Sequence, residues 1–192
     1  MTDRRLLMSI RFASKADLPA MLAIYAPYVE TTAYSFEYTP PTLEEFTARF
    51  AHHTAQFPWL VWEENGQVLG YAYGSAPFSR AAYGWCAEVS IYLSPSIHGK
   101  GVGRALYTAI ETLLDRQGYY LIYAIVTSSN TGSLAFHKAL GYRETATFPL
   151  LAYKFGSCHS VTWLEKRLKP VEYPSKPPIP IAEIVNTDRN FL

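Results

Sequence analysis

A glycine-rich loop near the middle of the chain, residues 98–104 (HGKGVGR), has the composition of an anion-binding turn. An apolar stretch that resembles a strand precedes it, and apolar residues recur at helical spacing after it. A loop that opens into a helix directs several backbone N–H groups at one point, where the helix dipole also favours negative charge. The spacing therefore predicts a cradle for a pyrophosphate group; the alternative is a tight turn that binds nothing.

Two better-known phosphate loops do not describe this segment. A P-loop requires Ser or Thr directly after its lysine, whereas Gly101 follows Lys100. A dinucleotide-binding loop lies early in a βαβ unit and is followed about 20 residues later by an acidic residue. Here the loop is in mid-chain, and the later stretch, residues 119–123, is YYLIY. The open question is which other phosphate-bearing ligand the loop takes.

The composition is that of one globular domain without a strong electrostatic preference. The chain has 192 residues, of which 49% are hydrophobic and 17% charged, and its formal net charge is +1. This balance predicts no nucleic-acid partner and no anionic membrane surface. No apolar run approaches the roughly 20 residues of a membrane span, and no signal peptide is evident. We therefore expect a cytoplasmic location.

Sulfur-containing and titratable residues form no disulfide or metal pattern. Cys86 and Cys158 are the only cysteines, and two are too few for a disulfide framework, so both are expected to be reduced. No set of His, Cys, Asp and Glu has the spacing of metal ligands, so no metal is predicted. His52 and His53 fall in a polar stretch and are expected to face solvent.

The elements that must position the loop follow from capping, periodicity and turn signals. A capping box at Ser14 begins a first helix, which should kink or end at Pro27, and another at Thr42 begins a second. The second helix should present Leu43, Phe46 and Phe50 on one face. Strands are predicted at residues 10–13, 59–62, 68–73, 87–93, 119–126, 152–155 and 161–165, and further helices at 105–114 and 130–140. The order is β-α-α-β-β-β-α-β-α-β-β, an α/β (α+β) layout with a mostly antiparallel sheet.

Turn residues mark three boundaries in this layout. Asn65-Gly66 is a strong hairpin signal, Gly118 should end the helix after the loop, and Gly156 should join the last two strands. From Pro170 the composition changes, because five prolines preclude a helix or central strand up to Ile181. We therefore divide the chain into a domain, residues 1–169, and a Pro-rich C-terminal extension, residues 170–192, an appended arm.

Several short motifs in this order match a known family. Besides the glycine loop they are Asn130-x-x-Ser133, Phe136-His137-x-x-x-Gly141-Tyr142, Tyr34-Ser35-Phe36, Pro58-Trp59-Leu60-Val61, Arg80-x-x-Tyr83, Ala87-Glu88-x-x-Ile91-Tyr92-Leu93-Ser94-Pro95 and Tyr153-Lys154-x-Gly156. Over residues 10–168 the chain resembles the GNAT N-acetyltransferases, and more closely the phosphinothricin (L-amino acid) N-acetyltransferase branch. The resemblance implies a GNAT fold, with a central mixed sheet splayed between its two middle strands and helices on both faces. It also implies acetyl-CoA as cosubstrate and a homodimer.

The resemblance assigns roles to individual residues. Glu88 stands at the position of the catalytic base, and His137 at that of a group that protonates the leaving thiolate or contacts the acceptor. The alternative for Glu88 is a salt bridge at a strand edge. Residues implied to bind acetyl-CoA are Ile91, Leu93, Lys100, Gly101, Val102, Gly103, Arg104, Ala105, Asn130 and Ser133. Residues implied to bind the acceptor are Phe36, Phe78, Arg80, Tyr83, Tyr92 and Lys154.

The chain departs from the branch chiefly on its acceptor side. His98 replaces the usual Gln or Arg of the loop, and Phe78 stands where close relatives often carry a basic residue. Cys158 and Ser160 lie where an aromatic residue followed by an acid is common. We expect direct acetyl transfer, in a ternary complex, to the α-amino group of a small amino acid or analogue such as phosphinothricin or methionine sulfoximine. The alternatives are another small amine or a protein N-terminus, or a non-catalytic acetyl-CoA-binding module.

Overall fold

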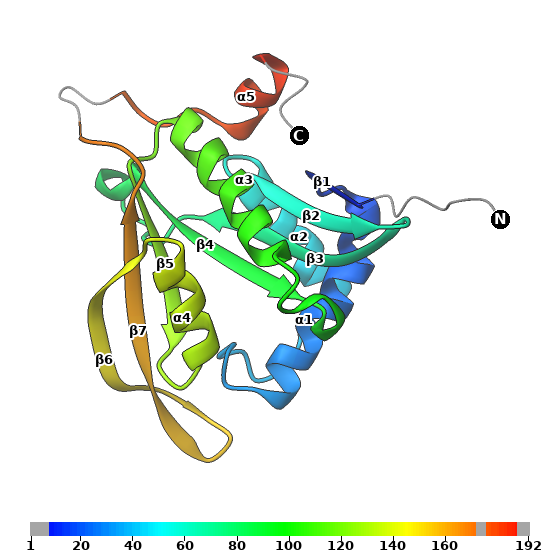
Figure 1. The fold of residues 1–192 in the computed structure, drawn as a ribbon, viewed down its shortest axis with the longest axis vertical. Coiled ribbons are helices and arrows are strands. Elements are labelled where there is room, and N and C mark those ends of the chain that lie inside the picture. Colours follow the sequence, from blue (N-terminus) through cyan, green and yellow to red (C-terminus); the bar gives the residue numbers. More distant parts are fainter. Residues whose placement is uncertain (1–7, 172–175, 188–192) are drawn as a thin grey trace.

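The fold is a seven-stranded sheet with helices on both faces (Figure 1). The computed structural model describes residues 8–171 and 176–187. The strand order is β1-β2-β3-β4-β5-β7-β6, and only the β4–β5 pair is parallel. The strands are β1 (Met8–Phe12), β2 (Trp59–Glu64), β3 (Gln67–Ser75), β4 (Cys86–Leu93), β5 (Leu121–Thr127), β6 (Arg143–Lys154) and β7 (Ser157–Arg167). The helices are α1 (Leu18–Thr31), α2 (Leu43–Thr54), α3 (Val102–Gln117), α4 (Thr131–Ala139) and α5 (Ile181–Thr187), with 3-10 turns η1 (Lys15–Asp17), η2 (Ala81–Tyr83) and η3 (Pro95–Ile97).

The sheet splits between its two middle strands, as the resemblance implied. β4 pairs with β5 only from Cys86 to Glu88, opposite Leu121 to Tyr123, whereas it pairs with β3 from Glu88 to Leu93. Beyond Glu88 the two strands diverge, and this gap is visible between β4 and β5 in Figure 1. The predicted fold class, element order and splay are therefore confirmed.

Two hydrophobic clusters hold the two faces of the sheet. α3 buries Leu106 and Ile110 against Val89 of β4 and Ile122 of β5, and α4 lies on the same face (Figure 1). α1 and α2 form a second cluster on the opposite face, over β2, β3 and the end of β4. On this opposite face β5, β6 and β7 carry exposed side chains, because α1 and α2 cover only the other half of the sheet.

α1 does not end at Pro27, one of the two outcomes expected there, and Leu43 of α2 is not packed with Phe46 and Phe50. Pro27 lies inside α1, which continues to Thr31. Proline removes one helical hydrogen bond, but Val29 beyond it is fully buried, and the Thr31 hydroxyl donates to the Pro27 carbonyl at 2.7 Å. In α2, Phe46 and Phe50 are buried as expected, whereas Leu43 in the first turn is 46% exposed. Packing of the helix thus begins one turn later than the apolar pattern indicated.

The last hairpin is longer than the sequence suggested. β6 and β7 extend over residues 143–154 and 157–167, with register shifts at Glu144/Ala146 and Phe148/Ala152. These bulges interrupt the alternation on which strand prediction depends, and Leu150 within the second one has φ 52°. The turn itself lies at Gly156, as predicted, where Phe155 and Gly156 both have positive φ.

The segment after the prolines packs onto the domain. α5 begins at Ile181, where the predicted proline block ends, and it lies beside the C-terminal end of α3 (Figure 1). Ile181 and Ile184 are 7% and 6% exposed and belong to the same cluster as Leu113 and Tyr119. Within the described ranges no helix is long and apolar enough to cross a membrane.

Candidate active site

The backbone of β4 presents unpaired peptide groups to the gap. The Ser94 N–H donates to the Leu69 carbonyl at 2.8 Å, which fixes the alternation of the β3–β4 ladder. The peptide groups of Val89, Ile91 and Leu93 therefore point away from β3, where β5 no longer pairs with them. Buried peptide groups require partners, so this edge can receive a ligand that pairs as an additional strand.

Two tyrosine hydroxyls occupy the ends of this edge. The Tyr28 hydroxyl donates to the Leu93 carbonyl at 2.6 Å, and the Tyr107 hydroxyl lies 3.3 Å from the Val89 carbonyl. Ile91 lies between these two positions, and the β4–β5 ladder gives it no partner on the side of the gap. Its peptide group is thus the most accessible hydrogen-bonding position along the splay.

A cavity of about 630 Å³ runs from the splay to the glycine loop. It is lined by β4, the loop and the start of α4, including Ile91, Leu93, Gly101, Asn130 and Ser133. A smaller cavity of about 90 Å³ continues between β4 and β5 and shares Ile91, Asn130 and Ser133 with the first. The size and shape suit a long ligand with a bulky head at the loop and a thin arm in the splay.

The glycine loop is built as an anion cradle at the start of α3. Gly101 is the N-cap of α3 with φ 82°, and the first helical hydrogen bond is from Ala105 N to Gly101 O. The N–H groups of Val102, Gly103 and Arg104 thus lack intrahelical partners. A Cβ on Gly103 would lie 3.2 Å from Phe136, so the close approach of α3 and α4 requires glycine there. The loop therefore offers three adjacent donors at a positive helix end.

Charged side chains surround this cradle without filling it. Lys100 and Arg104 are exposed, and the Arg104 guanidinium lies 3.5 Å from the Ala139 carbonyl. Asn130 is the N-cap of α4, where its side-chain oxygen accepts from Ser133 N at 3.1 Å. Asn130 thus caps α4, whereas contacts of these residues with a cofactor stay predictions.

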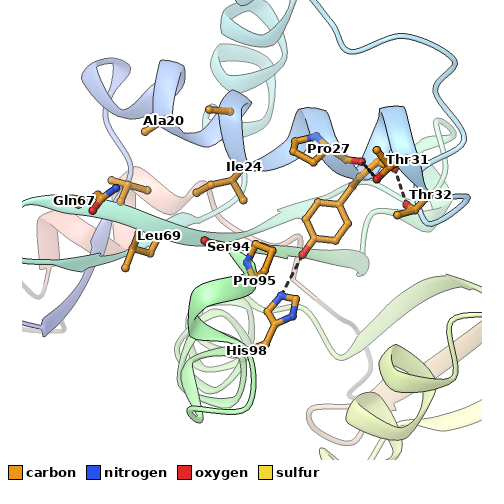
Figure 2. Close-up of a pocket in the computed structure, with 13 residues that line it drawn as sticks. Ala20, Ile24, Pro27, Thr31, Thr32, Gln67, Leu69, Ser94, Pro95 and His98 are labelled. Carbon is orange, nitrogen blue, oxygen red and sulfur yellow. Dashed lines mark hydrogen bonds between the residues drawn. The ribbon is translucent and has the colours of Figure 1, made fainter.

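The contact between Tyr28 and His98 separates the cofactor-sized cavity from an apolar groove. The Tyr28 hydroxyl lies 3.3 Å from His98 Nε2, and both residues line both spaces. The groove, about 410 Å³, lies between α1, β3 and the Ser94-Pro95 turn (Figure 2). Of the residues that the structure describes, Tyr28 and His98 are the only titratable side chains that line the groove. Within these ranges the groove therefore lacks the pair of acidic and basic groups that a catalytic site would need.

Glu88 stands at the apex of the splay, on the face opposite α3. Burial raises its pKa to about 7, and none of the described lysines or arginines forms an ion pair with it. The salt bridge that was the alternative for this residue is therefore absent from the described ranges. A carboxyl group that titrates near neutrality and carries no counter-ion can accept a proton from an ammonium group.

His137 is buried in a hydrogen-bonded relay with Tyr107. Its Nδ1 lies 2.7 Å from the Ser133 carbonyl, which can only accept, so Nδ1 carries a proton. Its Nε2 lies 2.7 Å from the Tyr107 hydroxyl, and burial lowers the pKa of the imidazole. In the neutral tautomer Nε2 accepts, and the Tyr107 hydroxyl donates to it. Both side chains line the smaller cavity.

Tyr107 was missed by the sequence reasoning. It belongs to the apolar face of α3, where its periodicity indicates only a core residue. The available signal was its hydroxyl, because a buried tyrosine normally needs a hydrogen-bond partner. Nothing in the local sequence showed that this partner is His137, thirty residues later.

Several expected acceptor residues lie in aromatic clusters, and one of these clusters includes Tyr123, the register partner of Glu88. In the loop between β3 and β4, Phe78 stacks on Trp163 with ring centroids 5.6 Å apart and contacts Tyr83 at 4.7 Å. Arg80 is exposed at the start of η2 and forms no ion pair with the residues that the structure describes. Tyr92 packs edge-on against Tyr25 at 4.7 Å, deeper under α1. Phe36 lies 6.2 Å from the ring of His159.

Two expected side chains have other surroundings than foreseen. The Lys154 ammonium is buried and donates to the carbonyls of Val29, Thr32 and Ser35 at 2.6, 2.9 and 2.7 Å. Its three donors are thus occupied, which corrects the expectation that it approaches an anionic acceptor group. His53 was expected in solvent but is half-buried beside Trp59 and Tyr73, and burial lowers its pKa.

No metal-binding cluster is found. Among residues 8–171 and 176–187, no group of three or more His, Cys, Asp and Glu could hold a metal ion. The absence of a metal cofactor stays a prediction.

Comparison with known proteins identifies the family. Residues 10–163 match the family described as "Acetyltransferase (GNAT) domain". A phosphinothricin N-acetyltransferase of Streptomyces viridochromogenes is 32% identical over 96% of this chain and 100% of its own. An L-methionine sulfoximine/L-methionine sulfone acetyltransferase of Salmonella typhimurium is 35% identical over 84% of this chain and 95% of its own.

A solved structure agrees with the sequence relatives. A GNAT superfamily phosphinothricin acetyltransferase of Sinorhizobium meliloti, in complex with acetyl-CoA, superposes with a TM-score of 0.82 and 33% identity over 88% of this chain and 97% of its own. With this match, the glycine cradle and the splayed β4 edge have the fold context that acetyl-CoA binding needs. The chain belongs to the GNAT family and is an N-acetyltransferase.

Proposed function

We propose that this enzyme transfers the acetyl group of acetyl-CoA directly to the α-amino group of a small amino acid or analogue of the phosphinothricin or methionine sulfoximine type. The observation that carries this proposal is Glu88, a buried carboxyl group at the apex of the splay, with a pKa of about 7 and no cation partner among the described residues. A non-catalytic acetyl-CoA-binding module would not need such a group. The relatives named above support the amino-acid class of acceptor.

The residues present fit acetyl-CoA. The amides of residues 101–104 would hold the pyrophosphate, the peptide group of Ile91 and the N–H of Leu93 would pair with the pantetheine, and Asn130 and Ser133 line the same cavity. The Ala105 N–H, expected to join the cradle, instead donates to the Gly101 carbonyl. Bound acetyl-CoA supplies the thioester. In the ternary complex Glu88 takes the proton of the acceptor ammonium, directly or through water, and the Ile91 N–H polarises the carbonyl. The Tyr107 hydroxyl, which donates to His137 Nε2 in this structure, would turn to the departing sulfur and protonate it.

The acceptor would be held from the open side of the sheet. Arg80 can bind an α-carboxylate with its two-pronged guanidinium, and Tyr83 lies in the same turn. Phe78 and Trp163 would contact the acceptor side chain. Phe78 stands where close relatives often carry a basic residue. The second candidate is therefore an acceptor of another kind: one with an apolar side chain, another small amine or a protein N-terminus.

We further propose a homodimer formed by the uncovered part of the sheet. Phe148, Leu150, Leu151, Tyr153 and Phe155 are each 43% exposed or more, and most of them lie on the edge strand β6. Several large apolar side chains exposed along an edge strand favour pairing with another chain. A Leu150→Glu, Leu151→Glu variant should therefore elute as a monomer in light-scattering chromatography, whereas a wild-type monomer would contradict the dimer. We also propose a cytoplasmic location, because acetyl-CoA is present there and the reducing environment keeps Cys86 and Cys158 as thiols.

The decisive assay is CoA release with a panel of acceptors. It contains phosphinothricin, methionine sulfoximine, methionine sulfone, the standard amino acids, polyamines and short peptides. Turnover of the amino-acid analogues that Glu88→Gln abolishes supports the proposal. Turnover of peptides or polyamines alone supports the second candidate. Acetyl-CoA binding without any turnover would contradict both.

A further inference from the structure

The C-terminal arm, residues 176–187, is hydrogen-bonded to the far end of α3. The Ile179 N–H donates to the Gln117 carbonyl at 2.8 Å, and the Gln117 side chain donates back to the Ile179 carbonyl at 2.7 Å. The same side chain donates to the Gln56 carbonyl at 2.6 Å, which also accepts from the Ile181 N–H. The Gln56 side chain also donates to the Pro178 and Ile179 carbonyls at 3.4 and 3.3 Å. The arm is thus fastened by two glutamines to the end of α3 and to the segment between α2 and β2.

A second attachment connects the arm to the acceptor side. The indole N–H of Trp85 donates to the Lys176 carbonyl at 2.9 Å. Trp85 ends the loop that carries Arg80 and Tyr83 and directly precedes β4, three residues before Glu88. Its carbonyl accepts from Tyr120 N at 3.2 Å, and the Tyr120 carbonyl accepts from Leu168 N at 2.9 Å. One line of hydrogen bonds therefore runs from the arm across the closed end of the splay.

The loop itself, residues 76–85, has few other anchors. Arg80, Ala81, Ala82 and Tyr83 are exposed. Besides the ring contacts of Phe78, the loop is tied by the Cys86 thiol to the Tyr83 carbonyl at 3.1 Å. A short exposed segment held at so few points depends on its ends for its geometry. Trp85 is the end that the arm reaches.

The arm is remote from the glycine cradle. It contacts the C-terminal end of α3, and the cradle is at the N-terminal end of the same helix. A helix of 16 residues is about 24 Å long, so the two attachments are separated by that distance. A change in the arm should therefore reach the acceptor loop and leave the acetyl-CoA cavity unaltered.

We propose that the C-terminal arm is a positioning element for the acceptor loop, acting through the bond between Trp85 and the Lys176 carbonyl. Docking of the arm fixes the loop in the geometry that binds the acceptor and does not change the affinity for acetyl-CoA. The expected effect on acceptor binding rests on the acceptor role proposed above for Arg80 and Tyr83. The expected effect on the order of the loop does not depend on that role.

The test compares two indole N–H groups in the full-length enzyme. Trp85→Phe removes the bond to the arm and keeps an aromatic ring, and Gln117→Leu removes the side-chain bonds of the arm to α3. Trp62→Phe is the matched control, because its indole donates to Glu64 at 2.9 Å on β2. For each variant we would measure the hydrogen-exchange rates of residues 76–85, the KM and kcat for the acceptor, and the Kd for acetyl-CoA.

The expected result separates loop order, acceptor binding and cofactor binding. Trp85→Phe and Gln117→Leu should speed exchange of the loop and raise the acceptor KM about three- to tenfold, the loss of one hydrogen bond, with an unchanged acetyl-CoA Kd. Loop exchange equal to that of Trp62→Phe would overturn the proposal. So would an acetyl-CoA Kd that weakens as much as the acceptor KM. Faster exchange with an unaltered acceptor KM would instead contradict the acceptor role of the loop.

Discussion

In the proposed complex the two sides of the splay bind their ligands by different means. On the cofactor side the donors are peptide groups: the Ile91 position on β4 and the amides that follow Gly101. On the acceptor side they are side chains, with Arg80 and Tyr83 on an exposed turn and an aromatic wall formed by Phe78 and Trp163. Backbone donors are fixed by the fold and are indifferent to most substitutions, whereas side-chain donors change with each residue. This contrast separates the binding of acetyl-CoA from the choice of acceptor.

The strongest way to break the contrast is to remove the group that lies between the two sides. Glu88→Gln keeps the shape of the side chain but cannot accept the ammonium proton, so kcat should fall about 10²–10⁴-fold. The acetyl-CoA Kd, measured by calorimetry, should stay within twofold of wild type. A variant with more than a tenth of wild-type kcat would show that another base acts.

The acceptor side should respond to Arg80 alone. Arg80→Ala removes a charge-assisted contact with a carboxylate, so we expect the KM for amino-acid acceptors to rise about 10–100-fold. Acceptors without a carboxylate should be unaffected, which makes a polyamine the control substrate. An equal loss for both kinds of acceptor would mean that Arg80 supports the loop and does not bind a carboxylate.

The relay in the small cavity should affect turnover more than binding. Tyr107→Phe removes the hydroxyl that faces both His137 and the splay, and we expect kcat to fall about tenfold or more with little change in either KM. Product-burst kinetics would locate the loss in the chemical step. Wild-type kcat in this variant would leave protonation of the thiolate to water.

Backbone strain in the glycine loop should weaken the binding of acetyl-CoA. Gly101 has φ 82°, which costs a residue with a side chain about 1–2 kcal/mol, so Gly101→Ala should weaken acetyl-CoA binding about tenfold. Gly66→Ala, at φ 81° in the β2–β3 turn, is the matched control, which should lower stability without altering the Kd. Equal cofactor affinities in the two variants would argue against the cradle.

The smallest effect concerns pH. Burial raises the pKa of Glu88 from 4.5 to about 7, so its base form predominates only above that pH. With acetyl-CoA saturating, kcat/KM for the acceptor should rise with pH through about 7 and level off above it. Glu88→Gln should lose this limb, and a wild-type profile that is flat between pH 6 and 8 would contradict the assignment.

The sequence predicted the backbone around the glycine loop and along β4 better than the side-chain contacts of the expected acceptor residues, for a physical reason. Glycine spacing, the Asn130 cap and the apolar alternation of β4 are local patterns that determine backbone geometry directly. The partner of Tyr107, thirty residues away, and the three carbonyls around Lys154 depend on packing between distant segments. α1 continues past Pro27 for the same reason, since burial of Val29 outweighs the local preference of proline to end a helix. Local rules cannot reveal contacts that only the folded chain brings together.

At the wide end of the splay, side chains donate hydrogen bonds to backbone carbonyls of neighbouring segments. Tyr28 ties the end of α1 to Leu93 of β4, and Thr127 of β5 donates its hydroxyl to the Ala33 carbonyl at 2.5 Å. Lys154 holds the same segment from the hairpin. The gap between β4 and β5 is therefore bordered at its narrow end by the Glu88–Tyr123 pair and at its wide end by these bonds. In the proposed complex acetyl-CoA and the acceptor reach this gap from opposite faces of the sheet, so each product can depart by the side from which its parent substrate entered.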